Sequence, residues 1–293
     1  MESTTSSTGN RPHRVQMAHA PETSVHASQL GPVRLPIHFF AVATAFFLLG
    51  VSAMPWITPD VIEFFYQPLP LALVHAFTLG WITATIMGVM YRYVPALTRT
   101  PLRFPRLAYA QLILFVIGAA GMVAHFAIGV WLGTWLAAIV MVVSVIMFAA
   151  NMLPCLAPKA GGGVAETGML IAVGFLVLAA SVGLLLALDK TFGFLHGSVL
   201  TNLAGHAHLA ALGWVTLTIC AVSYRMIPAF VLPQVGLPRS AVWQLYGLAF
   251  GVAGLVATLF AEIPVVIKFE IHPSGPAPLK GHAGQSHHFW VHS

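Results

Sequence analysis

The sequence predicts an all-α protein, a polytopic membrane helix bundle of about seven transmembrane helices in which two helices are homologous repeats. Three observations support this fold class. The chain is 58% hydrophobic and only 7% charged, whereas soluble domains carry about a quarter charged residues. Its apolar runs are long enough to span a bilayer, which takes roughly 20 residues. Two of these runs are copies of each other.

The repeat relates residues 75–96, HAFTLGWITATIMGVMYRYVPA, to residues 208–229, HLAALGWVTLTICAVSYRMIPA. Without any gap, 12 of 22 positions are identical. Common apolar composition explains the shared Leu, Ile and Val, but not a shared His, Trp, Tyr-Arg and Pro in one register. We therefore interpret the chain as a scaffold that holds two equivalent helices, each with a histidine near one end.

The domain organisation follows the apolar runs. Residues 1–34 are polar, lack hydrophobic periodicity and are predicted to form a disordered cytoplasmic tail. The transmembrane helix bundle is predicted over residues 35–262, and residues 263–293 form a polar, histidine-rich tail. The predicted spans are 35–54, 71–94, 107–128, 131–152, 169–188, 203–227 and 242–260, with an aromatic interfacial segment over 55–70.

The basic residues predict the orientation. With a cytoplasmic N-terminus, ten of the 13 Lys and Arg residues lie on inner segments, which is a strong positive-inside bias. We therefore expect a multi-pass protein of a bacterial-type inner (plasma) membrane. Because these residues lie in loops between apolar runs, the net charge of +5 does not indicate nucleic acid, and the expected partner is membrane lipid.

Five histidines are predicted to gather near the outer face of the membrane. An ionisable side chain inside the bilayer is a functional-site hypothesis by default, and a neutral imidazole is the commonest metal ligand. Two histidines at equal depth on parallel helices could hold one haem iron between them, and His75 and His208 meet this condition. The five residues are His75, His125, His196, His206 and His208.

The other three histidines are predicted to have different roles. His206 lies two residues before His208, about 200° around a helix, so the two cannot serve the same iron. That spacing suits a helix that stands between two cofactors. For His125 and His196 two interpretations stay open, a metal ligand or a structural histidine that donates to a carbonyl one turn away. The histidines of the polar tail are interpreted as solvated.

The remaining repeated positions are interpreted as structural. Gly80 and Gly213 permit close helix approach, and the tryptophans that follow them are predicted to pack. Tyr91 and Arg92, with their copies in the second unit, are predicted to anchor the helix ends at the membrane interface.

The segment GHAHLAALGWVTLTICAVSYRMIP, residues 205–228, resembles the tenth helix of subunit I in C-type (cbb-type) haem-copper oxidases. In that helix a GHxHxxALGW segment precedes a tyrosine and Ile-Pro. The resemblance implies a b-type haem protein in which His208 and His75 ligate a low-spin haem b and His206 faces a second, high-spin haem. The segment from Val74 to Leu102 is also similar to NnrS-type membrane haem-copper proteins, which are linked to nitric oxide.

The chain is shortened relative to these oxidase subunits, whose spans form a larger set of four-helix arcs. A copper site beside the high-spin haem needs three further histidines, including an adjacent pair on one span. No such pair occurs within a predicted span. The predicted spans therefore lack the histidines that a copper site needs. Complete oxygen reduction by this chain alone is not expected, although a cytochrome c oxidase-like oxidoreductase role stays open.

Three functions follow. The favoured one is a haem protein in electron transfer or the O2/NO chemistry of a respiratory chain, with other respiratory membrane subunits or a cytochrome electron donor as partners. The second is an NnrS-like, nitric-oxide-responsive gas-binding protein. The third is a transporter of a small solute or metal ion that uses the outer-face histidines. Colour separates them, because a haem protein absorbs visible light and a transporter does not.

Overall fold

The structure is a computed structural model that describes residues 34–57, 67–157, 163–195, 197–231 and 239–261. Most of these residues are helical, and none of them forms a strand. Within them, seven helices are long and apolar enough to cross a membrane, which confirms the predicted fold class and number of spans. The two polar tails and residues 58–66 of the interfacial segment lie outside the described residues, so their boundaries stay predictions.

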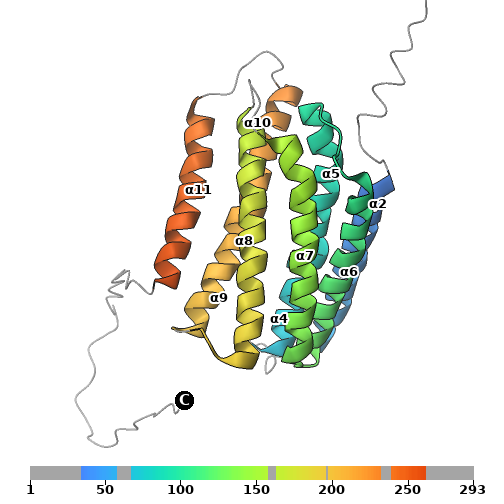
Figure 1. Cartoon of the computed structure of the whole chain (residues 1–293), viewed down its shortest axis with the longest axis vertical. Coiled ribbons are helices and arrows are strands. Elements are labelled where there is room, and N and C mark those ends of the chain that lie inside the picture. Colours follow the sequence, from blue (N-terminus) through green and yellow to red (C-terminus); the bar gives the residue numbers. More distant parts are fainter. Residues whose placement is uncertain (1–33, 58–66, 158–162, 196, 232–238, 262–293) are drawn as a thin grey trace, which may run out of the picture. The chain divides into compact units, whose positions relative to one another are not determined.

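Each predicted span corresponds to one helical rod, and most rods are longer than predicted (Figure 1). Hydropathy marks the hydrocarbon core, whereas a helix continues into the headgroup region. The elements are, in order, α2 (Arg34–Ala53), η1 (Met54–Trp56), α4 (Pro68–His75), η2 (Ala76–Thr83), α5 (Ala84–Thr98), α6 (Pro105–Ala127), α7 (Trp131–Leu156), α8 (Val164–Phe192), α9 (Val199–His208), η3 (Leu209–Thr216), α10 (Leu217–Val231) and α11 (Arg239–Phe260).

Both repeat helices contain a feature that the sequence did not predict. The rod α4–η2–α5 and the rod α9–η3–α10 each change from α-helix to an eight-residue π-helical segment and back. In both rods the π-helical segment begins directly after the repeated histidine, His75 or His208. π-Helical geometry is rare and occurs frequently at functional sites. The two copies therefore share a backbone conformation as well as a sequence.

The repeated glycines lie inside these π-helical segments and pack as predicted. A Cβ atom at Gly80 would overlap the ring of Phe46 on α2. A Cβ atom at Gly213 would lie 2.7 Å from Cγ of Phe175 on α8. In each half, the glycine of the repeat helix therefore packs against a phenylalanine of the preceding transmembrane helix. Helices α2 and α8 thus occupy equivalent places in the two halves.

The repeat also extends beyond the two histidine-bearing helices. Residues 105–127 and 238–260 are related by the same offset of 133 residues that relates His75 to His208, and 10 of these 23 positions are identical. The first range forms α6, and the second contains α11. The two halves therefore correspond over three spans each, and α7 has no counterpart among the described helices.

One polar interaction is conserved between the halves. The Tyr91 hydroxyl donates to Oε1 of Gln111 at 3.2 Å, and the Tyr224 hydroxyl donates to Oε1 of Gln244 at 3.0 Å. Tyr91 is only 1% exposed and its ring packs 5.4 Å from that of Phe148. The predicted role of Tyr91 as an interfacial anchor is therefore wrong, because the hydroxyl is satisfied inside the bundle.

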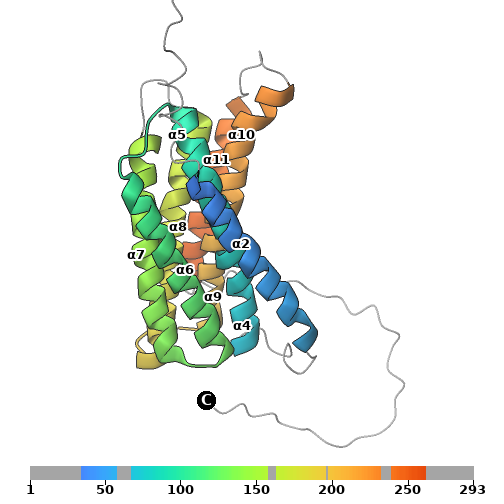
Figure 2. The same ribbon diagram turned by 90° about the vertical axis from the view of Figure 1, so that its right-hand side faces the viewer.

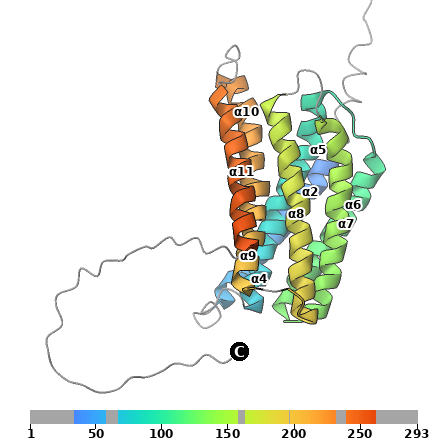
Figure 3. The same ribbon diagram turned by 60° about the vertical axis from the view of Figure 1, so that its left-hand side comes forward.

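The helices of each half pack mainly against one another, and α7 and α8 join the two halves (Figures 1 and 2). In the first half, α6 packs along α4 and α7, while α2 crosses α5 and η2. Helix α7 then packs along α8, which contacts η3 and α10. Helix α11 packs mainly against α9 and lies at one edge of the bundle (Figure 3).

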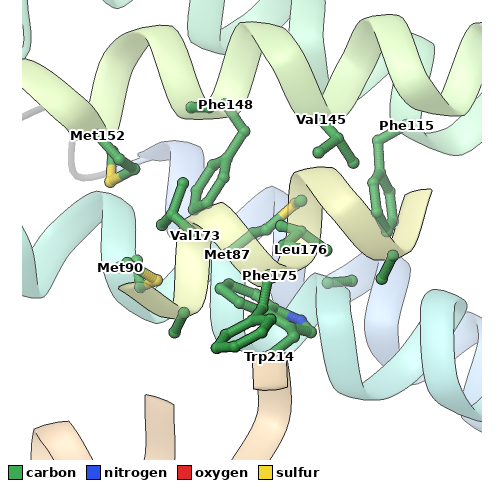
Figure 4. Close-up of a cluster of buried hydrophobic side chains, with 14 of the residues drawn as sticks. Met87, Met90, Phe115, Val145, Phe148, Met152, Val173, Phe175, Leu176 and Trp214 are labelled. Carbon is green, nitrogen blue, oxygen red and sulfur yellow. The ribbon is translucent and has the colours of Figure 1, made fainter. Parts of the chain in front are cut away.

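The core lies where the two halves meet. Figure 4 shows Trp214 of η3 beside Phe175 of α8, with Phe148 of α7 and Met87 of α5 close by. Trp214 is 1% exposed and its ring stands edge-on to that of Phe148 at 6.2 Å. The apolar interior is thus continuous between the two repeat helices, at the level of their π-helical segments.

Candidate functional site

His75 and His208 occupy the same place in their two rods, as the last residue of α4 and of α9. The Nδ1 atom of His75 lies 2.7 Å from the carbonyl oxygen of Leu71. The Nδ1 atom of His208 lies at the same distance, 2.7 Å, from the carbonyl oxygen of Ala204. Both side chains are half-buried.

These hydrogen bonds determine the tautomer of both rings. A carbonyl oxygen only accepts, so Nδ1 carries the proton and Nε2 keeps its lone pair. Metal-ligating histidines usually donate their other ring N–H in this way, which holds the ring and raises its basicity. His75 and His208 therefore have the donor chemistry that an axial haem ligand requires, in two copies.

His206 faces a different helix. Its Nδ1–H donates to the carbonyl oxygen of Ala179 on α8 at 3.1 Å. The ring lies against Gly183, where an added Cβ atom would be 2.8 Å from Cε1 of His206. His206 and His75 are also close enough to interact electrostatically. His206 therefore lies beside α8 and within electrostatic range of His75.

His125 packs at the short turn between α6 and α7. Its Nδ1–H donates to the carbonyl oxygen of Gly121 at 2.7 Å, and its ring fills the space beside Gly133, where a Cβ atom would overlap it. The next residue, Phe126, stacks on His75 with ring centroids 4.7 Å apart. The structural interpretation of His125 thus has a specific contact, and α6 reaches the histidine cluster through Phe126.

His75, His125, His206 and His208 lie toward the same end of the bundle, the lower end in Figure 1, where α6 ends and where α4 and α9 lie. His196 lies outside the described residues, as do the histidines of the tail. Within the described part of the chain, no three His, Cys, Asp or Glu side chains form a group that could hold a metal ion.

Sequence reasoning missed two features beside this cluster. The π-helical segments carry no local sequence signal, because the apolar residues of a membrane helix fit an α-helix and a π-helix alike. The second feature is the hydrogen bond from Trp214 to Thr83, at 3.2 Å, which joins two residues that are not counterparts in the repeat. The repeat alignment alone could therefore not pair them.

Comparison with known protein families gives one match. Residues 19–262 match the family described as cytochrome c and quinol oxidase polypeptide I. No curated protein and no solved structure matches the chain. The family match covers all seven membrane-spanning helices and both repeat units. The chain therefore belongs to the cytochrome c and quinol oxidase polypeptide I family, the family of haem-copper oxidase subunit I.

Proposed function

We propose that this chain is a membrane b-type haem protein that works in electron transfer or in the O2/NO chemistry of a respiratory chain. One observation carries the proposal, namely the matched geometry of His75 and His208. Each imidazole follows the same helix segment, has its Nδ1–H bound to its own helix at 2.7 Å, and leaves Nε2 as the ligating atom. Family membership supports haem as the cofactor.

In this proposal His75 and His208 would hold a low-spin haem between them. When bound, the haem supplies a one-electron redox couple or, where an axial position is open, a site for a diatomic gas. The chain itself holds two imidazoles in one tautomer and places Phe126 against one of them. His206 would serve a second, high-spin haem.

A second ligand assignment has its own support. The electrostatic interaction between His206 and His75 favours His206 as the residue opposite His75. The repeat favours His208 instead, because His208 and not His206 is the copy of His75. Single substitutions separate the two assignments, as argued in the Discussion.

The proposed setting is a bacterial-type inner membrane with a cytoplasmic N-terminus. The histidine cluster would then lie toward the outer face, where a cytochrome electron donor or another respiratory subunit could approach it. Copper is not part of the proposal, because no adjacent pair of histidines lies within a predicted span.

The test is a reduced-minus-oxidised absorption spectrum of the purified full-length protein, with and without carbon monoxide. A low-spin b-type spectrum that carbon monoxide leaves unchanged supports electron transfer. A spectrum that carbon monoxide or nitric oxide shifts supports the gas-binding function, including the NnrS-like one. A colourless protein that fails to bind added haem contradicts the proposal and favours the transporter.

A further inference from the structure

The ring of His75 lies against an aromatic stack that begins with Phe126 of α6. The centroids of the two rings are 4.7 Å apart and their planes are inclined by 37°, which is within the range at which aromatic rings attract one another. Phe126 is only 7% exposed, so this contact is made inside the bundle. One face of the His75 imidazole is therefore covered by a side chain of another helix.

The stack continues from Phe126 to the outer ends of α7 and α8. The ring of Trp131, the first residue of α7, stands edge-on to Phe126 with centroids 5.9 Å apart. The Nζ atom of Lys190 on α8 lies 5.2 Å from the centroid of Trp131, which is a cation–π distance. Phe126 is thus held between two rings from different helices, and it cannot turn away from His75 without losing contact with Trp131 as well.

Two contacts therefore act on the His75 ring. The hydrogen bond from Nδ1 to the carbonyl oxygen of Leu71, at 2.7 Å, fixes the direction of one edge of the imidazole. That bond alone leaves the ring free to rock about its own axis. The contact with Phe126 restricts this rocking, because any large tilt drives the imidazole face into the phenyl ring. Contacts of this kind, one step removed from the ligand, orient metal-ligating histidines.

His208 has the hydrogen bond but lacks the aromatic contact. Its Nδ1 binds the carbonyl oxygen of Ala204 at 2.7 Å, yet no aromatic ring stacks on it in the part of the chain that the structure describes. At the offset of 133 residues, the counterpart of Phe126 is Leu259. The two copies of the repeat therefore constrain their histidines unequally.

We propose that Phe126 is a positioning residue that fixes the plane of the His75 ring, so that His75 is the rigid axial ligand and His208 the adjustable one. This inference rests on the proposed function, in which these two histidines hold a haem. The g values of a low-spin ferric haem depend on the angle between its two imidazole planes. Phe126 touches neither the iron nor the reacting gas, and its effect on that angle passes through His75 alone.

The first measurement is low-temperature electron paramagnetic resonance of the full-length haem-loaded protein. Phe126→Leu keeps an apolar side chain but removes the ring, and we expect it to shift the highest g value and broaden the low-spin line. Trp131→Leu removes the support behind Phe126 and should produce a smaller shift in the same direction. Phe126→Tyr keeps the ring and should restore the parent signal.

The matched control is Phe115→Leu, the same change at a buried position of the same helix. Phe115 lies about three turns before Phe126, where its ring packs on Phe39 with centroids 6.1 Å apart. Phe115→Leu loosens the packing of α6 but should leave the g values unchanged. A shift as large as that of Phe126→Leu would assign the effect to helix packing and overturn the positioning role.

A second measurement does not require haem. The full chain is produced in cells that cannot make haem, reconstituted in liposomes and treated with diethyl pyrocarbonate, which acylates the free imidazole nitrogen. Mass spectrometry gives the acylation of His75 relative to His208. We expect Phe126→Leu to raise this ratio by about threefold or more, because the uncovered and less restricted ring is easier to reach. Phe126→Tyr and Phe115→Leu should not raise it.

The outcomes separate this inference from the proposed function. A parent low-spin signal that Phe126→Leu leaves unchanged would overturn the positioning role and leave haem binding by His75 and His208 standing. A parent chain without any low-spin signal would contradict the proposed function instead. The acylation ratio then decides on Phe126 alone, and an unchanged ratio would show that Phe126 does not restrict the His75 ring.

Discussion

The indole nitrogen of Trp214 donates a hydrogen bond to the hydroxyl of Thr83 at 3.2 Å, inside the bundle and between the two repeat helices. The equivalent pair does not form. Trp81, the copy of Trp214, is 39% exposed and packs 4.7 Å from the ring of Phe47. The Thr216 hydroxyl donates to the carbonyl oxygen of Ala211. The two repeat helices thus contact each other through residues that are not counterparts, because Trp214 lies between the helices and Trp81 does not.

Replacing Trp214 by Phe should therefore destabilise the protein, whereas Trp81→Phe should not. The Phe ring keeps only part of the apolar contact and leaves the Thr83 hydroxyl without its donor, whereas Trp81 makes no such bond in the described structure. We expect a loss of about 1 kcal/mol in the free energy of unfolding for Trp214→Phe. Unfolding in mixed detergent micelles measures both variants. Equal losses would show that ring size, rather than the hydrogen bond, matters at these positions.

The two glutamines give a second matched pair. Gln111→Leu leaves the buried hydroxyls of Tyr91 and Ser144 without a side-chain partner, so we expect a loss of about 1 to 3 kcal/mol. Gln244→Leu removes one exposed hydrogen bond and should change the unfolding free energy of the isolated chain by less than about 0.5 kcal/mol. The same micelle titration compares them. A larger effect at Gln244 than at Gln111 would contradict the packing of α6 on α7.

The repeated glycines give a third pair. A methyl group at Gly80 would overlap Cβ and Cγ of Phe46, atoms close to the α2 backbone that cannot swing away. We expect Gly80→Ala to cost about 1 to 3 kcal/mol of unfolding free energy, as overpacked cores do. Gly251→Ala meets nothing within 4 Å and should be neutral or slightly stabilising. Thermal denaturation in detergent ranks the two, and a neutral Gly80→Ala would mean that α2 is free to shift.

The number of spans and the repeat were predictable because each rests on a long-range pattern. Seven apolar runs predict seven helices, since backbone groups in hydrocarbon must bond within their own segment. The role of the repeated glycines was also predictable. A glycine repeated within two membrane helices indicates that a neighbouring helix packs closely against it.

Side-chain pairs were harder to predict. The correspondence of Gln111 with Gln244 is visible in the sequence at the offset of 133 residues, but the loops after Pro95 and Pro228 do not match and conceal it. Tyr91 was misjudged because an aromatic next to an arginine is typical of the interface, whereas its hydroxyl finds Gln111 inside the bundle. The contact of His206 with Ala179 depends on how α8 crosses α9, which no local pattern encodes.

The orientation can be tested with reporter fusions. Alkaline phosphatase fused after residue 97 should be inactive, because the basic loop that follows α5 is predicted to be cytoplasmic. Fused after residue 130, in the turn between α6 and α7, it should be active. Enzyme activity in whole cells measures both fusions. The reverse pattern would place the histidine cluster at the cytoplasmic face.

The ligand assignment makes the last prediction. If His75 and His208 hold one iron, each supplies one axial position, and neither alone gives a six-coordinate low-spin haem. His75→Ala and His208→Ala should therefore lose the low-spin signal to the same extent, and low-temperature electron paramagnetic resonance measures it. His206→Ala should keep that signal and lose carbon monoxide binding, if a second haem is present.

His38→Ala is the matched control, because Nδ1 of His38 also binds the carbonyl oxygen four residues earlier, at 2.6 Å, but the residue is exposed near the start of α2. It should leave the spectrum unchanged. If His206→Ala removes the low-spin signal and His208→Ala spares it, the ligand pair is His75 and His206. A signal that survives the loss of His75 excludes both assignments, since His75 belongs to each. His125 then becomes the next candidate, and its removal should also loosen the packing at Gly133.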